Sequence, residues 1–149
     1  MSFWLGVTGR PSFSKKDEVW VTKLCKVEAP HRPGFCDKNK DGVYKLDDAL
    51  GKAVDILSKE YNKYPLPHRL NSTCSIKLVT DMEFEQINTG HLNANGVTMK
   101  YPLSCKILIN TLDKVVLGHE LLHFAEWKLG IKTTEGFIYS YESEVAKRL

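Results

Sequence analysis

Residues 115–130 read VVLGHELLHFAEWKLG, and inside this stretch residues 119–123 form the pentapeptide His-Glu-Leu-Leu-His. A helix advances about 100° per residue, so His119 and His123 would project from one face, one turn apart. Two imidazoles at that spacing can bind one zinc ion, and Glu120 would lie where it can accept a proton from a metal-bound water. The alternative is a pair of packed histidines with a surface Glu between them.

The surrounding residues favour a buried helix over 112–129. Asn110 or Thr111 can supply the N-cap, Asp113 would lie in the first turn, and Gly130 can end the helix in the left-handed conformation. Buried His and Glu side chains without partners would cost several kcal/mol in rough terms, and a divalent cation would satisfy them. The apolar residues surround the whole helix: Leu112, Val115, Val116, Leu117, Leu121, Leu122, Phe124, Ala125, Trp127 and Leu129.

The motif and its apolar flanks, residues 116–125, resemble the active-site helix of the zincin metalloproteases. The metzincin branch continues with Gly and His at the positions of Glu126 and Leu129, so that branch is excluded. The SprT-like branch has a later His and a zinc ribbon of four cysteines. In this chain no His follows His123, and no Cys-x-x-Cys motif occurs.

The gluzincin branch takes its third zinc ligand from a Glu on the next helix. Residues 133–149, TTEGFIYSYESEVAKRL, predict such a helix, capped by Thr133 or Thr134. The resemblance implies Glu142 as the ligand, 19 positions after His123, with Glu144 as the fallback; Glu135 and Glu126 are poorer candidates. Its apolar side carries Phe137, Ile138, Tyr141, Val145 and Leu149.

The expected fold class is α+β and zincin-like. A small twisted mixed β-sheet would pack against a backing helix and the motif helix, with the Glu-bearing helix at the C-terminus. Residues 46–63 predict the backing helix, which Pro65 and Pro67 end, and residues 74–80 predict a strand. Residues 103–110, LSCKILIN, predict another strand after an Asn-Gly turn at 95–96. The resemblance implies that this strand borders the cleft and pairs with an extended peptide through its exposed edge.

Residues 37–48, DKNKDGVYKLDD, resemble the calcium loop of dockerins and EF-hands. Side-chain oxygens fall at loop positions one, three, five and twelve, and Gly42 at position six suits a turn with positive φ. Prolines upstream exclude an entering helix, so a structural calcium site with a helix only on its exit side is expected. An Asx-rich turn is the alternative. The ligands would be Asp37, Asn39, Asp41, Asp48 and the carbonyl of Val43.

Length and composition fit one domain over residues 1–149, with residues 1–20 as an N-terminal arm or first strand and residues 1–16 as a candidate pro-segment. A net charge of +3 with scattered lysines excludes a nucleic-acid footprint, and no apolar run is long enough to span a membrane. No signal-peptide core is visible, so a cytoplasmic location is expected, or an extracellular one where a leader has been removed. The oligomeric state is left open.

Four cysteines, Cys25, Cys36, Cys74 and Cys105, allow two disulfides, and Cys25 with Cys36 or Cys74 with Cys105 are candidate pairs. Free buried thiols are the alternative in a reducing compartment.

The expected function is zinc-dependent hydrolysis of a peptide or protein substrate, with zinc held by His119, His123 and Glu142 and with Glu120 as general base. Tyr139, Tyr141 and His91 are candidates for a second electrophile. Two other classes stay open: a catalytically silent zincin-like binding module, and an interaction module stabilised by calcium.

Overall fold

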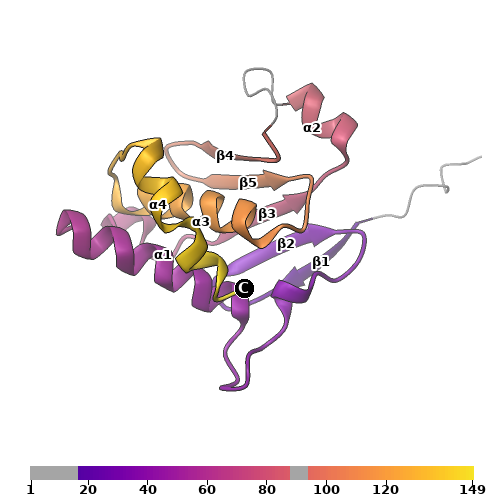
Figure 1. Ribbon diagram of the computed structural model, residues 1–149, viewed down its shortest axis with the longest axis horizontal. Coiled ribbons are helices and arrows are strands. Elements are labelled where there is room, and N and C mark those ends of the chain that lie inside the picture. The colour runs from indigo at the N-terminus through magenta and orange to yellow at the C-terminus, as the bar shows by residue number, and fades with distance from the viewer. Residues whose placement is uncertain (1–16, 88–93) are drawn as a thin grey trace, which may run out of the picture.

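The computed structural model describes residues 17–87 and 94–149, and these form an α+β fold with a five-stranded mixed sheet and four α-helices (Figure 1). The strand order is β1-β2-β3-β5-β4. The three central strands run parallel, and an antiparallel strand closes each edge. The strands are β1 Glu18–Val21, β2 Cys25–Ala29, β3 Cys74–Leu78, β4 Gly96–Lys100 and β5 Cys105–Ile109.

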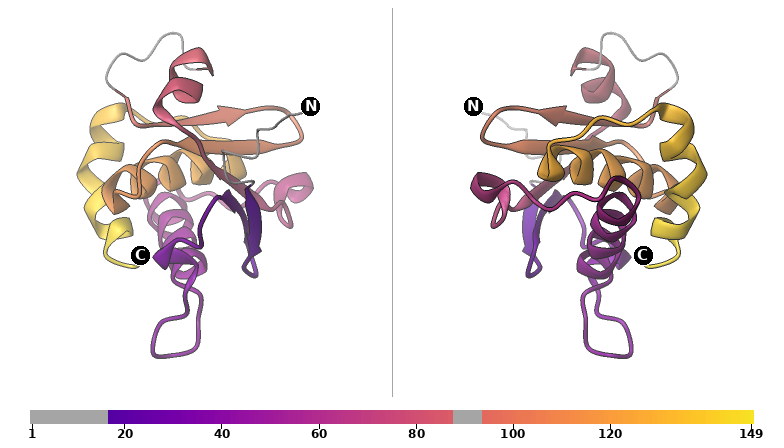
Figure 2. Two further views of the ribbon diagram at one scale, coloured as in Figure 1. Left: turned by 90° about the vertical axis from the view of Figure 1, so that its right-hand side faces the viewer. Right: turned by 90° about the vertical axis from the view of Figure 1, so that its left-hand side faces the viewer.

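Three of the helices cover one face of the sheet: α1 Lys45–Tyr61, α3 Lys114–Leu129 and α4 Glu135–Ala146 (Figure 2). Side chains alternate along a strand, so Ile107 and Ile109 of β5 face these helices while Leu108 faces the other side. There the short helix α2, Asp81–Ile87, packs Phe84 against Leu108. The main core therefore lies between the sheet and the α1–α3–α4 layer.

The motif helix α3 is buried on nearly every side, as predicted, but it begins two residues later than expected. Asp113 is the N-cap, and its carboxylate accepts a hydrogen bond from the Val115 N–H at 2.9 Å. Leu112 therefore lies outside the helix and is exposed. Gly130 ends α3 with φ of 68°, which confirms the predicted left-handed cap. Thr134, the second of the two expected residues, caps α4.

The strand that precedes α3 is not at the edge of the sheet, contrary to expectation. It is shorter than the predicted 103–110, and as β5 it lies between β3 and β4. The edge strand is β4, which begins at Gly96, so the Asn95-Gly96 pair starts a strand instead of forming the expected turn. The reverse turn between β4 and β5 lies at residues 101–104, where the Tyr101 N–H bonds to the Ser104 carbonyl.

The other expected elements fall close to their predicted places. The backing helix is α1, which ends at Asn62 in the left-handed conformation before the two prolines. The predicted strand 74–80 is β3. Within the expected N-terminal arm, β1 is the described part; the candidate pro-segment, residues 1–16, lies outside the described residues. Sequence reasoning did not identify β2 or α2.

All four cysteines are buried and free, so neither proposed disulfide is present. Cys25 and Cys74 are paired residues on neighbouring parallel strands. Burial raises the pKa of Cys36 to about 11 and that of Cys105 to about 12, and it holds the pKa of Cys74 well above its usual range. The cysteines therefore act as small apolar core residues. Within the described part of the chain, no helix has the length and apolarity needed to cross a bilayer.

Candidate metal centre

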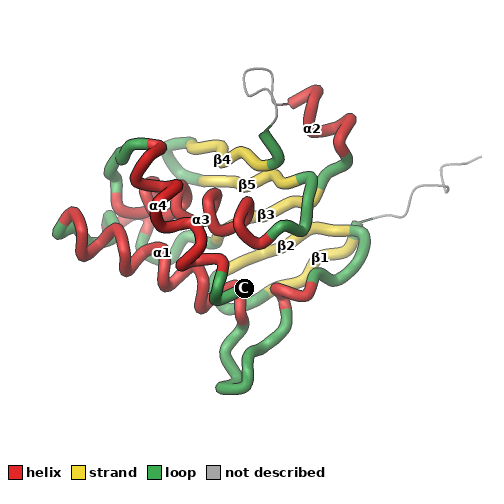
Figure 3. Tube along the Cα trace, in the orientation of Figure 1, coloured by secondary structure: helices red, strands yellow, loops and turns green. Residues whose placement is uncertain are grey.

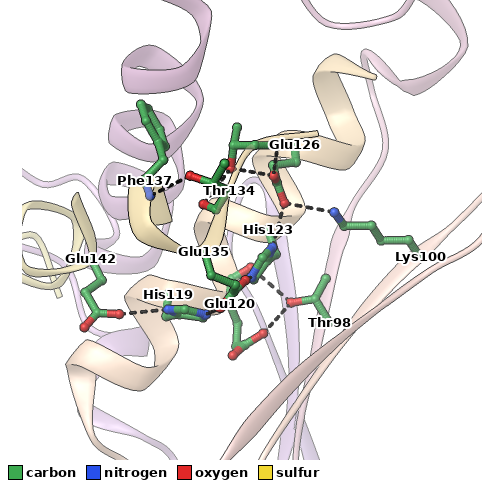
Figure 4. A network of polar contacts seen from close by, with 11 residues as sticks. Thr98, Lys100, His119, Glu120, His123, Glu126, Thr134, Glu135, Phe137 and Glu142 are labelled. Atoms are coloured by element: carbon green, nitrogen blue, oxygen red, sulfur yellow. Dashed lines mark hydrogen bonds and ion pairs between the residues drawn. The ribbon is translucent and has the colours of Figure 1, made fainter. Parts of the chain in front are cut away.

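His119 and His123 project from α3 toward the start of α4, where they meet one carboxylate (Figure 4). The Nε2 atom of His123 lies 2.9 Å from Oε1 of Glu135, and Nε2 of His119 lies 3.4 Å from Oε2 of the same residue. Among residues 17–87 and 94–149, these three form the one group of at least three His, Cys, Asp or Glu side chains whose ligand atoms all lie within 4.8 Å of one another.

This arrangement fits a zinc ion. Bond lengths near 2.1 Å in a tetrahedral site place neighbouring ligand atoms about 3.4 Å apart. The separations of 2.9 and 3.4 Å belong to different oxygens of Glu135, and the three ligand atoms lie within 4.8 Å of one another. Binding through one carboxylate oxygen would therefore require the Glu135 side chain to turn and to move outward from His123. Glu135 is the first residue of α4, and its side chain is 59 % exposed, so it has room to move.

Each histidine is also held from behind by a second carboxylate. Nδ1 of His119 lies 2.8 Å from Oε2 of Glu142, and Nδ1 of His123 lies 2.6 Å from Oε1 of Glu126. An ionised carboxylate only accepts hydrogen bonds, so both Nδ1 atoms donate, and in the neutral rings the lone pair is then on Nε2. This tautomer is the one needed to ligate a metal at the position beside Glu135.

For both His123 and Glu126, burial shifts the pKa in one direction and the neighbouring charged and hydrogen-bonding groups shift it in the other. Burial lowers the pKa of His123, but the hydrogen bond and charge of Glu126 outweigh it, so the pKa lies above its ordinary value. Burial likewise raises the pKa of Glu126, yet hydrogen bonds from His123, Thr133 and Lys100 hold it well below its usual range. Glu126 is therefore ionised at neutral pH.

Glu120 lies beside the histidines and is held by the edge strand. The Thr98 hydroxyl on β4 donates to Oε1 of Glu120 at 2.8 Å, whereas Oε2 has no hydrogen-bond partner among the described residues. Burial raises the pKa of Glu120, and the Thr98 hydrogen bond and the nearby histidines oppose that rise. A Cβ on Gly96 would lie 3.0 Å from Cγ of Glu120, so the absence of a side chain there makes room for this carboxylate.

These groups open into a cleft of about 860 Å³ between the edge strand and the two helices. The ring of Tyr139 lies at its margin, with its centroid 5.0 Å from that of His119. Tyr141 packs against Phe137, and His91 lies outside the described residues. The cleft is lined from three elements by Ala94, Asn95, Gly96, Val97, Thr98, Lys100, Val115, Val116, His119, Glu120, His123, Glu135, Tyr139 and Glu142.

The acidic residues of α4 do not all lie where the sequence placed them. Glu142, expected as the third ligand, contacts Nδ1 of His119, whereas Nε2 of the same ring faces Glu135. Glu144, the fallback, points elsewhere and lies 3.9 Å from Lys52 of α1. Glu135 is the residue of α4 that faces both Nε2 atoms. It lies seven residues before Glu142, and two helical turns return to nearly the same face. The Thr134 cap, which makes Glu135 the first helical residue, was the sequence signal for this position.

The expected calcium loop, residues 37–48, runs into the first turn of α1, and the part before the helix projects from the rest of the molecule (Figure 3). Gly42 has φ of 80°, as the loop pattern predicted, and a short 3₁₀ turn, η1 Gly34–Cys36, comes directly before the loop. The Asn39 carboxamide oxygen accepts hydrogen bonds from the Asp41 and Val43 N–H groups, which is an Asx turn. Tyr44 is the N-cap of α1 and makes no side-chain capping bond.

Four of the five expected calcium ligands, all except Asp41, use their ligand oxygens in contacts with other protein groups, and Asn39 does so in the Asx turn. Asp37 lies 2.8 Å from Arg32, and Asp48 lies 2.9 Å from Arg148. The Val43 carbonyl accepts a hydrogen bond from the Asn39 N–H at 2.7 Å. Calcium binding by this loop stays a prediction, and the loop geometry is explained by the Asx turn alone.

Comparisons with models of protein families, with curated proteins and with solved structures gave no match.

Proposed function

We propose that this protein is a zinc-dependent metallopeptidase in which His119, His123 and Glu135 hold the metal. One observation carries the proposal: two imidazole Nε2 atoms and a carboxylate meet beside the partly free carboxylate of Glu120, inside an open cleft. Three protein ligands with an open side are the arrangement of catalytic zinc sites, whereas structural sites are closed by four.

Zinc supplies a Lewis acid that polarises a peptide carbonyl and acidifies a water molecule. In this chain Glu120 is the general base. Its Oε1 is fixed by Thr98, so Oε2 accepts the proton from water and then donates it to the leaving amine. Because burial raises the pKa of Glu120, this carboxyl is a better proton acceptor than an exposed one.

The edge strand β4 suits an extended substrate. Thr98 and Lys100 point from it toward α3, and no strand of residues 17–87 or 94–149 pairs with the side of β4 away from β5. A peptide laid antiparallel or parallel to β4 would bond through its main chain and pass the Glu120 carboxylate. A mixed sheet with an edge strand at the cleft, a motif helix behind it and a Glu-bearing helix after it supports a zincin-like fold for this chain.

Glu120→Gln tests the general base. We expect the variant to keep its zinc, because Glu120 is not in the ligand group. We expect its hydrolysis rate to fall by a factor of about 10²–10⁴. Zinc content by mass spectrometry and cleavage of a fluorogenic peptide library are the two measurements. Glu60→Gln, at an exposed position near the end of α1, is the matched control and should change neither.

The outcomes separate the competing functions. Equal turnover by Glu120→Gln and wild type would refute the role of Glu120. Zinc lost by His119→Ala, with no cleavage by wild type across the library, would favour a catalytically silent binding module. Zinc that His119→Ala retains would refute the site itself.

A further inference from the structure

Glu126 is the most deeply buried charged side chain near the site, with 2 % of its surface exposed. Burial of an unpaired carboxylate costs several kcal/mol in rough terms, so such a group persists only with partners. Glu126 accepts four hydrogen bonds. Oε1 accepts from Nδ1 of His123 at 2.6 Å and from Nζ of Lys100 at 3.0 Å. Oε2 accepts from the N–H and the hydroxyl of Thr133, at 2.6 and 2.7 Å.

These partners come from three separate parts of the fold. His123 belongs to α3, and Lys100 ends the edge strand β4 (Figure 4). Thr133 lies in the connection between α3 and α4. Thr133 immediately precedes the Thr134 cap, and Glu135 follows the cap. Glu126, which orients His123, therefore also fixes the backbone at Thr133. Thr133 lies two residues before Glu135, the acidic residue that faces His123.

We propose that Glu126 is a positioning residue that holds His123 and Glu135 close to each other, so that both side chains reach one metal position. The proposal rests on the zinc site described under the proposed function. Through Oε1, Glu126 holds the His123 ring with Nε2 directed into the cleft. Through Oε2, it holds Thr133 and so the start of α4. Lys100 balances the negative charge.

Glu142 provides the internal comparison. It makes the same carboxylate-to-Nδ1 contact with the other histidine, His119, but within the described part of the chain it makes no hydrogen bond to the connection between α3 and α4. Removing Glu142 should therefore loosen one ring, whereas removing Glu126 should loosen a ring and the Glu135 backbone together.

The test measures the zinc dissociation constant of the full chain by competition with a chromogenic chelator. We expect Glu126→Gln to weaken zinc binding about 10–100-fold, the usual effect of losing a carboxylate behind a histidine ligand. We expect Thr133→Val, which keeps the shape and removes only the hydroxyl, to weaken it several-fold. Thr133 touches no ligand atom of the group, so a change in the visible spectrum of the cobalt-substituted variant would report altered ligand geometry.

A double-mutant cycle gives the decisive comparison. Glu126→Gln and Thr133→Val act through one contact, so the double variant should bind zinc no more weakly than Glu126→Gln alone. Thr133→Val and Glu142→Gln act on different parts of the site, so their effects should add. Circular dichroism of the metal-free variants checks that they fold.

The failures are distinguishable. If wild type binds one zinc that His119→Ala loses, but Glu126→Gln binds it as tightly as wild type, the positioning role is wrong and the site stands. If Glu126→Gln does not fold, Thr133→Val decides alone: an unchanged zinc dissociation constant and cobalt spectrum overturn the proposal. If wild type binds no zinc, the proposed function and this inference fail together.

Discussion

The His119 imidazole lies between two carboxylates of one helix, Glu135 at Nε2 and Glu142 at Nδ1. Seven residues of helix place the Cα atoms of these two residues about 10 Å apart along the α4 axis, on the same face, and the side chains converge on the ring between them. An imidazole that meets both has one nitrogen for a metal and one for its orienting partner. The two acidic residues therefore have different roles, although their chemistry is the same.

Alanine at each position separates these roles. Glu142→Ala removes an orienting partner, so we expect zinc binding to weaken about 10–100-fold. Glu135→Ala removes a ligand, so we expect a larger loss. Chelator competition under identical conditions gives both values. A greater loss for Glu142→Ala than for Glu135→Ala would return Glu142 to the ligand position that the sequence implied.

The motif residues could be predicted from sequence because the spacing of His119 and His123 in a helix is fixed by helix geometry. The identity of the third acidic residue could not. Sequence reasoning chose a face of α4 that contacts the histidines, but which turn of α4 meets their Nε2 atoms depends on how far α4 is shifted along α3. That shift is set by tertiary contacts, among them the bonds from Thr133 to Glu126.

At the scale of elements, the contact between α3 and α4 depends on Gly118. A Cβ at this position would lie 2.8 Å from the Glu142 carbonyl oxygen and 3.2 Å from the Ala146 nitrogen, both backbone atoms of α4. Backbone cannot rotate away as a flexible side chain does, so the helices approach this closely only where α3 has no side chain. The same approach brings the Glu142 side chain to His119.

Gly118→Ala should therefore destabilise the protein, by about 1–3 kcal/mol for the forced separation, less about 1 kcal/mol gained in helix propensity. The free energy of unfolding in urea is the measurement. Gly51→Ala is the matched control, since Gly51 is inside α1 and its added Cβ would meet nothing within 4 Å. We expect that control to be stabilised by about 0.5–1 kcal/mol. Equal effects at both glycines would contradict the close packing.

The long helices were predictable because their apolar residues and caps are local signals, whereas the place of each strand in the sheet is not local. Ile107, Leu108 and Ile109 are buried on both faces of β5, and such a strand needs neighbours on both sides. The residues of β4 are only partly buried, apart from the exposed Lys100, which suits an edge. The continuous apolar run Ile107-Leu108-Ile109 was the sequence signal for an interior strand.

At the scale of the whole molecule, the candidate site connects the motif helix with the beginning of the C-terminal helix. The apolar core lies between the sheet and the layer of α1, α3 and α4, and α4 packs mainly on α3. The site draws two residues from α3 and one from the start of α4, beside the edge strand. A bound metal would therefore fasten α4 to the rest of the molecule.

Zinc should raise the thermal stability of the protein for this reason. A ligand that binds only the folded state at 100 times its dissociation constant adds about 2.7 kcal/mol. For a chain of this size that corresponds to a rise of roughly 5–10 °C in the melting temperature. Differential scanning calorimetry with excess chelator and with zinc measures the shift, and hydrogen exchange should show the greatest gain in protection in α4. His119→Ala should melt at the same temperature in both conditions, because without its imidazole the two remaining ligands bind zinc too weakly. A zinc-dependent rise that survives in this variant would place the metal elsewhere in the chain.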